Sequence, residues 1–199
     1  MSIAHFVPGS ELFRRKLSVT AFNDGYDKFF ITITIDDNIF RTYSVNEQFE
    51  MTIQQIHKIL SFFDQYYIVS EIQPNTSNLH YHIMGVMNKH GGYLTTYKKQ
   101  YIDAPDESDL YYFINRRIRD RIETHGKFTV AGQLVTAIHS KTPFTDVKTL
   151  SPTQDFISYL HKDLDNLYGM TKYEKVRFII KAPVDELKGL NKLINFKKT

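Results

Sequence analysis

The chain has 199 residues, of which 42% are hydrophobic, and a formal net charge of +3 at pH 7. It contains no cysteine, which excludes disulfide bonds and zinc sites built from thiolates. No apolar stretch approaches the ~20 residues that a membrane-spanning helix needs, and the first residues lack the apolar segment of a signal peptide. We therefore expect an intracellular protein with one hydrophobic core and no membrane partner.

The first half of the chain predicts three strands and one helix. Residues 28–37 are rich in β-branched and aromatic residues, as strands are, and residues 67–72 and 79–87 have the same character. Residues 51–66 carry apolar side chains at helical spacing. The polar segment 74–78 predicts a turn between the second and third strands.

The second half continues this mixture of strands and helices. Its patterns predict, in chain order, a hairpin strand over 93–102, a helix over 106–122, a strand over 132–140, a helix over 151–169, a strand over 175–180 and a short helix over 184–194. Because helices interrupt a run of strands that includes hairpins, we expect an α+β fold with an antiparallel or mixed sheet covered by helices.

Two histidines, His80 and His82, lie inside the strand predicted over 79–87. Side chains two residues apart on a strand point to the same face, whereas Tyr81 between them points to the other. Two imidazoles on one face can hold a single metal ion. The alternative is that both are ordinary core or surface histidines.

Glu71 ends the preceding strand, and the short turn predicts that the two strands pair in antiparallel fashion. Such pairing places the carboxylate beside His80 and His82. One carboxylate and two imidazoles suit a divalent cation and leave positions open for water or phosphate oxygens. The alternative for Glu71 is a solvent-exposed carboxylate on an edge strand.

A second group of residues lies in the helix predicted over 151–169. Tyr159, Lys162 and Asp163 share one helical face, because they are three and four residues apart. A tyrosine hydroxyl beside a divalent ion that polarises a phosphate is competent for transesterification, and the lysine can stabilise the phenolate or bind the phosphate. The alternative is that Tyr159 is one of the packing or surface residues among 13 tyrosines.

In this order, the motifs "FFITITI" (29–35), "HYH" (80–82) and "YLHK" (159–162) resemble those of the HUH endonuclease domain of rolling-circle replication initiators. The likeness is greatest to the Rep proteins of circular single-stranded DNA viruses of eukaryotes. It covers roughly residues 28–168. The first motif lacks the polar ending that is common in the family, and residues 1–25 match no motif.

The resemblance implies a central antiparallel sheet of about five strands flanked by helices, with the metal on the sheet face. It divides the chain into an N-terminal extension (1–27), the endonuclease domain (28–168) and a basic C-terminal segment (169–199). That segment either packs on the domain or leads to the superfamily-3 helicase domain of full-length viral initiators. The chain has no Gly-x4-Gly-Lys-Ser/Thr phosphate loop, so two alternatives stay open: a nickase domain separated from its helicase, or a small stand-alone nickase.

The resemblance also implies a mechanism. Glu71, His80 and His82, with Asp163 nearby, hold Mg²⁺ or Mn²⁺. Tyr159 attacks the scissile phosphate of single-stranded DNA at an origin hairpin and stays joined to the 5′ end, while Lys162 stabilises charge. The free 3′ hydroxyl then primes rolling-circle replication, which takes place in the host nucleus if the source is a eukaryotic virus.

Basic and aromatic residues predict where DNA contacts the chain. The candidates are Tyr97, Lys98, Lys99, Arg116 and Arg117, with the cations on the DNA backbone and the tyrosine stacked on a base. The alternative for the two arginines is a solvated helix face balanced by neighbouring acidic residues.

Other functions fit parts of the same pattern. Parvovirus-type hairpin nickases share the histidine motif, and single-tyrosine transposases share the motif order, whereas conjugative relaxases place the tyrosine before the histidines. Two alternatives lie outside this class. One is an origin-binding module without catalysis, and the other is a metal-dependent hydrolase that activates water. The products distinguish these: a covalent adduct, no cleavage, or free ends.

Overall fold

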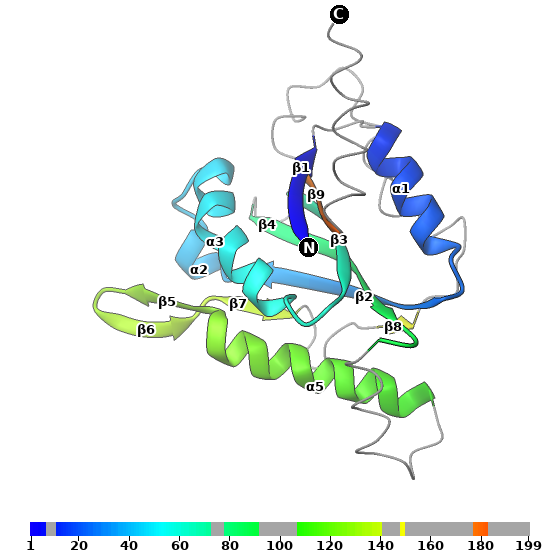
Figure 1. The fold of residues 1–199 in the computed structure, drawn as a ribbon. Coiled ribbons are helices and arrows are strands. Elements are labelled where there is room, and N and C mark those ends of the chain that lie inside the picture. The colour runs from blue at the N-terminus through cyan, green and yellow to red at the C-terminus, as the bar shows by residue number, and fades with distance from the viewer. Residues whose placement is uncertain (7–10, 73–77, 92–106, 141–147, 150–176, 183–199) are drawn as a thin grey trace, which may run out of the picture.

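The computed structural model describes residues 1–6, 11–72, 78–91, 107–140, 148–149 and 177–182 (Figure 1). Within them, one sheet of seven strands forms the centre of the molecule, in the order β1-β9-β3-β4-β2-β7, and β8 also pairs with β2. Every pair in this sheet is antiparallel. The strands are β1 (Ser2–Phe6), β2 (Tyr26–Ile35), β3 (Gln65–Ile72), β4 (Leu79–Asn88), β7 (Ile138–Ser140), β8 (Lys148–Thr149) and β9 (Arg177–Ala182).

Helices flank this sheet, and a separate hairpin projects from it (Figure 1). They are α1 (Glu11–Ala21), α2 (Asp37–Phe40), α3 (Val45–Ile59) and α5 (Glu107–His125), and the hairpin consists of β5 (Lys127–Val130) and β6 (Gln133–Thr136). A capping box fixes the start of α3: the Ser44 hydroxyl accepts from Glu47 N, and the Glu47 carboxylate accepts from Ser44 N at 2.8 Å. None of the described helices is long and apolar enough to cross a membrane.

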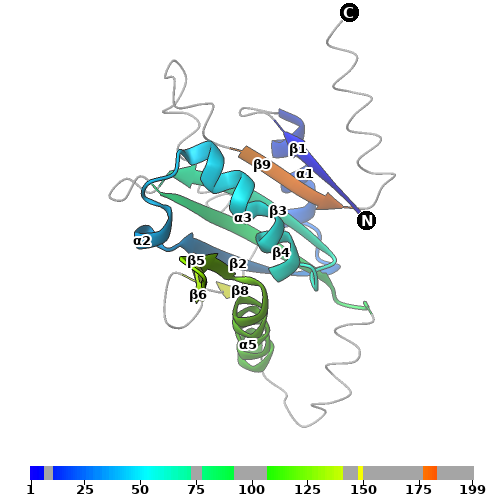
Figure 2. The ribbon, with the colours of Figure 1, turned by 90° about the vertical axis from the view of Figure 1, so that its left-hand side faces the viewer.

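The two faces of the sheet have different environments. On the core face, Ile31 and Ile33 of β2 and Ile83 of β4 are fully buried in a cluster that α3 and α5 complete with Ile53, Ile56, Ile59, Ile114, Ile118 and Ile122. On the second face, α1 packs near the start of β3, where the Thr20 hydroxyl lies 2.6 Å from that of Tyr67. Figure 2 shows α3 and α1 on opposite sides of the sheet.

The predicted fold class is confirmed: the protein is α+β, with a central antiparallel sheet and flanking helices. Five of the strands, β9, β3, β4, β2 and β7, match the expected number, and β1 and the two-residue β8 add to them. β1 comes from the expected N-terminal extension and pairs with β9, which comes from the expected basic C-terminal segment. β9 in turn pairs with β3, so the sheet extends across both expected boundaries.

One predicted strand is divided in two. Residues 132–140 were expected to form a single strand, but β6 ends at Thr136 and β7 begins at Ile138. The N–H groups of Ala137 and Ile138 both donate to the carbonyl of Gly126, at 2.8 and 3.1 Å, which interrupts the strand. β6 therefore pairs with β5, whereas β7 pairs with β2. The elements predicted over 93–102, 151–169 and 184–194 lie outside the described residues.

Candidate metal centre

The pairing of β3 with β4 brings the predicted carboxylate to the predicted histidines. Glu71 is directly opposite His80, and Val69 is opposite His82. Residues directly opposite each other in a sheet share a face, so all three side chains lie on the second face. The antiparallel arrangement inferred from the short turn between the strands is therefore confirmed.

Alternation along β4 explains why both imidazoles lie on this face. Tyr81, between them, is fully buried in the core, where its hydroxyl lies 2.5 Å from the hydroxyl of Thr52. A slip of one residue in register would move Tyr81 out of the core and both histidines into it. The core contact of Tyr81 therefore fixes the direction of His80 and His82.

A buried glutamine fixes the start of β4. Gln48, which is 2% exposed, accepts a hydrogen bond from Leu79 N at 2.9 Å. Its amide group donates to Asn78 Oδ1 at 3.1 Å, and Asn78 in turn donates to Asp37 Oδ1 at 2.9 Å. These bonds tie the residues before His80 to helices α2 and α3.

The candidate ligand atoms of Glu71, His80 and His82 converge. His80 Nε2 lies 3.0 Å from His82 Nε2, and each nitrogen lies 3.5 Å from Glu71 Oε2. Glu71 and His82 are buried, at 4% and 2% exposure, and His80 is partly buried. Within the described part of the chain, this is the one group of three or more such side chains whose ligand atoms lie within 4.8 Å of one another.

These separations fit a divalent cation. Ligands about 2.1 Å from an ion are about 3.0 Å apart at octahedral angles and about 3.4 Å apart at tetrahedral angles. Two imidazole nitrogens that face each other at 3.0 Å also repel through their lone pairs, unless a proton or a cation lies between them. The group formed by Glu71, His80 and His82 can therefore hold a metal ion.

The remaining ring nitrogens have unequal surroundings. His82 Nδ1 lies 3.4 Å from the Thr32 hydroxyl, and the His82 ring stacks on Phe30 with centroids 5.7 Å apart. These contacts hold the ring so that Nε2 points toward Glu71, which is the usual role of a residue behind a metal ligand. His80 Nδ1 is buried and has no hydrogen-bond partner among the described residues.

The electrostatics keep the carboxyl group of Glu71 ionised. Burial alone would raise the pKa of Glu71, but hydrogen bonds from His80 and His82, together with their charge, outweigh burial and lower that pKa to about 2. A carboxylate that is ionised throughout the neutral range is a ready metal ligand, because no proton must be displaced from it.

The other predicted site residues are distributed differently. Tyr159, Lys162 and Asp163 lie outside the described residues, as do the predicted DNA contacts Tyr97, Lys98 and Lys99. Arg116 and Arg117 are exposed on α5. That helix contributes Ile114, Ile118 and Ile122 to the core face, so it packs on the side of the sheet opposite the metal group.

Sequence reasoning did not identify Thr32 and Phe30, which support His82. Both lie in a strand that was predicted, and alternation places them on one face of it. Which residues of β2 meet the histidines depends on its register with β4, where Thr32 is opposite His82. That register joins segments about 50 residues apart, and no short turn in the sequence specifies it.

The candidate metal site thus consists of a buried Glu-His-His group on the second face of an antiparallel sheet, with supporting contacts from β2. Its chemistry suits a divalent cation with positions left open for other ligands. Comparisons with protein-family models, with curated proteins and with solved structures yield no match to this chain.

Proposed function

We propose that the chain is a metal-dependent endonuclease of the HUH type, which nicks single-stranded DNA and can rejoin it. The observation that supports this most directly is the convergence of Glu71, His80 and His82 on one face of an antiparallel sheet. The Y-x-x-K sequence at 159–162 supplies the nucleophile that such an enzyme requires. We further propose Mg²⁺ or Mn²⁺ as the ion and initiation of rolling-circle replication as the process.

The number of protein ligands found among the described residues favours catalysis over a purely structural metal. Structural sites for zinc are closed by four protein ligands, whereas catalytic sites use about three and leave positions for water or substrate. A bound divalent ion would polarise the scissile phosphate and reduce its negative charge. Glu71, His80 and His82 orient that ion, because two of the three are buried and His82 is held by Thr32 and Phe30.

Tyr159 carries out the proposed bond exchange. Its hydroxyl oxygen attacks phosphorus, a new phosphotyrosyl bond forms to the DNA 5′ end, and the bond to the 3′ oxygen breaks. The proton lost by the tyrosine is balanced by the proton that the departing 3′ oxygen takes up. In this proposal Lys162 stabilises the phenolate or the phosphate charge, and Asp163 lies near the ion.

A covalent-adduct assay tests the proposal. The protein is incubated with a pool of labelled single-stranded and hairpin oligonucleotides and Mn²⁺, and is then separated by denaturing electrophoresis. We expect a band that resists denaturation, depends on the metal, and is lost in Tyr159→Phe. Tyr168→Phe and Tyr173→Phe, which alter nearby tyrosines, serve as matched controls and should still form the adduct.

Three outcomes contradict the proposal in different ways. DNA cut to free ends without an adduct indicates a hydrolase that activates water. DNA bound without any cut indicates a binding module. An adduct retained in Tyr159→Phe and lost in one of the control variants assigns the nucleophile to another tyrosine.

A further inference from the structure

A row of polar side chains continues from the metal group across the sheet. Glu71 is opposite His80, His80 is opposite Thr34, and Thr34 is opposite His139 of β7. Four neighbouring strands thus present these residues on the second face. With strands ~4.8 Å apart, His139 lies roughly 10 Å from His80 along the row. Among the described residues of this row, the short side chain of Thr34 lies between them.

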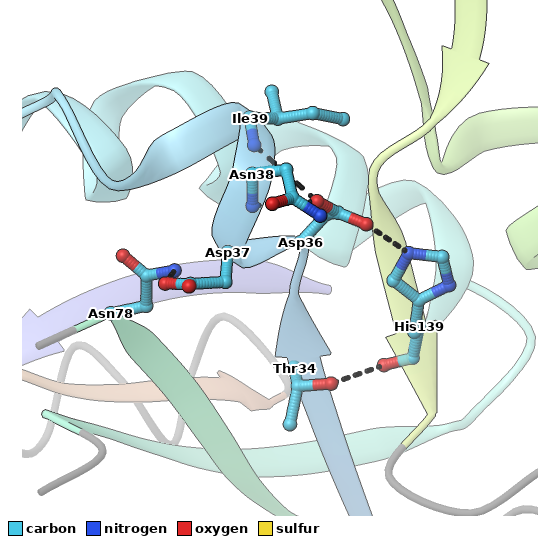
Figure 3. Close-up of polar contacts among 7 residues, drawn as sticks. All are labelled: Thr34, Asp36, Asp37, Asn38, Ile39, Asn78 and His139. Carbon is cyan, nitrogen blue, oxygen red and sulfur yellow. Dashed lines mark hydrogen bonds and ion pairs between the residues drawn. The ribbon is translucent and has the colours of Figure 1, made fainter. Parts of the chain in front are cut away.

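Asp36, just beyond the end of β2, is held firmly in place. Its Oδ1 atom accepts hydrogen bonds from the backbone N–H groups of Asn38 at 2.9 Å and Ile39 at 3.3 Å, as the N-cap of α2 (Figure 3). Its own N–H donates to the carbonyl of Ala137 at 2.9 Å, next to β7. The second carboxylate oxygen is therefore presented in a fixed direction.

That second oxygen faces an imidazole. Asp36 Oδ2 lies 3.4 Å from His139 Nε2, and Figure 3 shows the other ring nitrogen directed away from the carboxylate. The two side chains are 28% and 43% exposed. An ion pair this exposed contributes little to stability, so folding does not require the arrangement. Its effect is to orient one ring nitrogen of His139 outward, on the same face as the metal group.

An imidazole between two anions binds both as a double donor. When an anion approaches the outward nitrogen, Asp36 stabilises the second proton of the ring, and the charged imidazole donates to both partners. Doubly protonated in this way, the ring binds an anionic oxygen at its second nitrogen, and on a nucleic acid that oxygen belongs to a backbone phosphate.

We propose that His139, oriented by Asp36, binds the backbone phosphate of a nucleotide next to the one whose phosphate meets the metal group. This rests on the proposed function, because it takes single-stranded DNA as the substrate. The row from Glu71 to His139 then sets the direction in which the strand crosses β4, β2 and β7. His139 is a substrate-binding residue, and Asp36 is a positioning residue that acts through it.

The test combines a protein variant with a substrate in which one phosphate is neutral. Adduct formation and binding, the latter by fluorescence anisotropy, are measured for wild type and His139→Ala with a cleavable strand. The same strand is also made with a methylphosphonate at the first phosphate on either side of the scissile one. His90→Ala, at an exposed histidine in the turn after β4, is the matched control.

On unmodified DNA, we expect His139→Ala to raise KM and Kd about tenfold, as loss of a charge-assisted hydrogen bond does, with kcat little changed. At one of the two flanking positions, the methylphosphonate should weaken wild type by a similar factor and weaken His139→Ala no further. Asp36→Asn keeps the cap of α2 but removes the charge, and should show part of the same loss. Mn²⁺ affinity without DNA should not change in any of these variants.

The outcomes are separable. Equal KM and Kd for wild type and His139→Ala overturn this proposal while leaving the nickase intact. The proposal is also overturned if, at both flanking positions, the methylphosphonate weakens binding by His139→Ala as much as it weakens binding by wild type. His139 and the flanking phosphate then do not interact. If wild type binds single-stranded DNA but forms no adduct, the proposed function fails, and so does this proposal, which places His139 next to the scissile phosphate. If wild type binds no single-stranded DNA, both proposals fall.

Discussion

Glu71 and His80 stand directly opposite each other on β3 and β4, with Glu71 Oε2 3.5 Å from His80 Nε2. Buried carboxylates and imidazoles lose their hydration on folding, and this loss is compensated only when they pair with each other or bind a cation. The pairing of the strands therefore places the candidate metal ligands where a bound ion would stabilise the folded state. Metal binding should consequently raise the thermal stability of the protein.

Metal affinity should depend on all three side chains. Replacing Glu71, His80 or His82 by Ala removes one of three ligands, and we expect Mn²⁺ affinity to fall by more than about 100-fold, since even supporting residues cost 10–100-fold. Isothermal titration calorimetry on the protein without DNA provides the measurement. His90→Ala is the control and should bind as wild type does. Full affinity in His82→Ala would show that the ion binds elsewhere.

Metal binding should weaken in acid because of the histidines. The pKa of Glu71 is lowered to about 2, so its carboxylate is ionised at every pH where the protein is assayed. Imidazole binds a metal only when neutral, so the affinity should be highest above about pH 7 and should fall in acid, where histidines take up protons. In Glu71→Gln, the site lacks its carboxylate ligand, and the affinity at pH 8 should be lower. An affinity that does not change between pH 8 and pH 5 would show that no imidazole holds the ion.

The Thr32 hydroxyl should matter for the metal more than for the fold. Thr32→Val keeps the shape of the side chain but removes the group 3.4 Å from His82 Nδ1. We expect a loss of about tenfold in Mn²⁺ affinity, at the low end for residues that orient a ligand. Thr34→Val changes the neighbouring threonine on the same face and is the control. If the two variants bind the ion equally well, Thr32 does not orient His82.

Much of the metal group could be predicted because it lies in two strands joined by a short turn. The spacing of His80 and His82 specifies a common face, and the turn specifies the antiparallel partner that carries Glu71. The support from Thr32 and the row that ends at His139 could not be predicted in the same way. They depend on the pairing of β4 with β2 and of β2 with β7, which only the packed core decides.

The basic C-terminal segment shows a second limit of sequence patterns. Its residue pattern predicts a strand over 175–180, but the eight Lys and Arg residues against three Asp and Glu in residues 170–199 do not indicate whether that strand joins the sheet. The structure places β9 of this segment between β1 and β3, with Ile179 and Ile180 fully buried. Net charge describes a segment as a whole. The location of a six-residue strand within it depends instead on the few apolar side chains that the strand buries.

Gly85 of β4 should tolerate no side chain. A Cβ atom at this position would lie 2.6 Å from Cε1 and Cζ of Phe63, which is 1% exposed in the core. Gly85→Ala should lower the free energy of unfolding by about 1–3 kcal/mol, as overpacking does, and this can be measured by urea denaturation. The double variant Gly85→Ala with Phe63→Leu should be more stable than the sum of the two single losses predicts, because the smaller side chain leaves room. Strictly additive losses would mean that the contact with Phe63 does not limit residue 85.

Tyr159 should both cut DNA and rejoin it. Attack by a tyrosine exchanges one phosphodiester for another, so the energy of the broken bond is kept in the adduct and the reaction can run backwards. A second strand with a free 3′ hydroxyl, added to the purified adduct with Mn²⁺, should therefore be joined to the held 5′ end.

Single substitutions separate this joining step from binding and from the metal. Tyr159→Phe removes one oxygen atom, so it should eliminate the adduct and the joining while DNA binding and Mn²⁺ affinity are kept. His82→Ala should form no adduct, and removing the metal from the purified wild-type adduct with a chelator should block joining, because both directions pass through the same metal site. Mass spectrometry of the trapped adduct should place the nucleotide on the peptide that contains "DFISYLHK". A label on Tyr168 or Tyr173, or nicking that persists in Tyr159→Phe, would instead favour another nucleophile or an activated water.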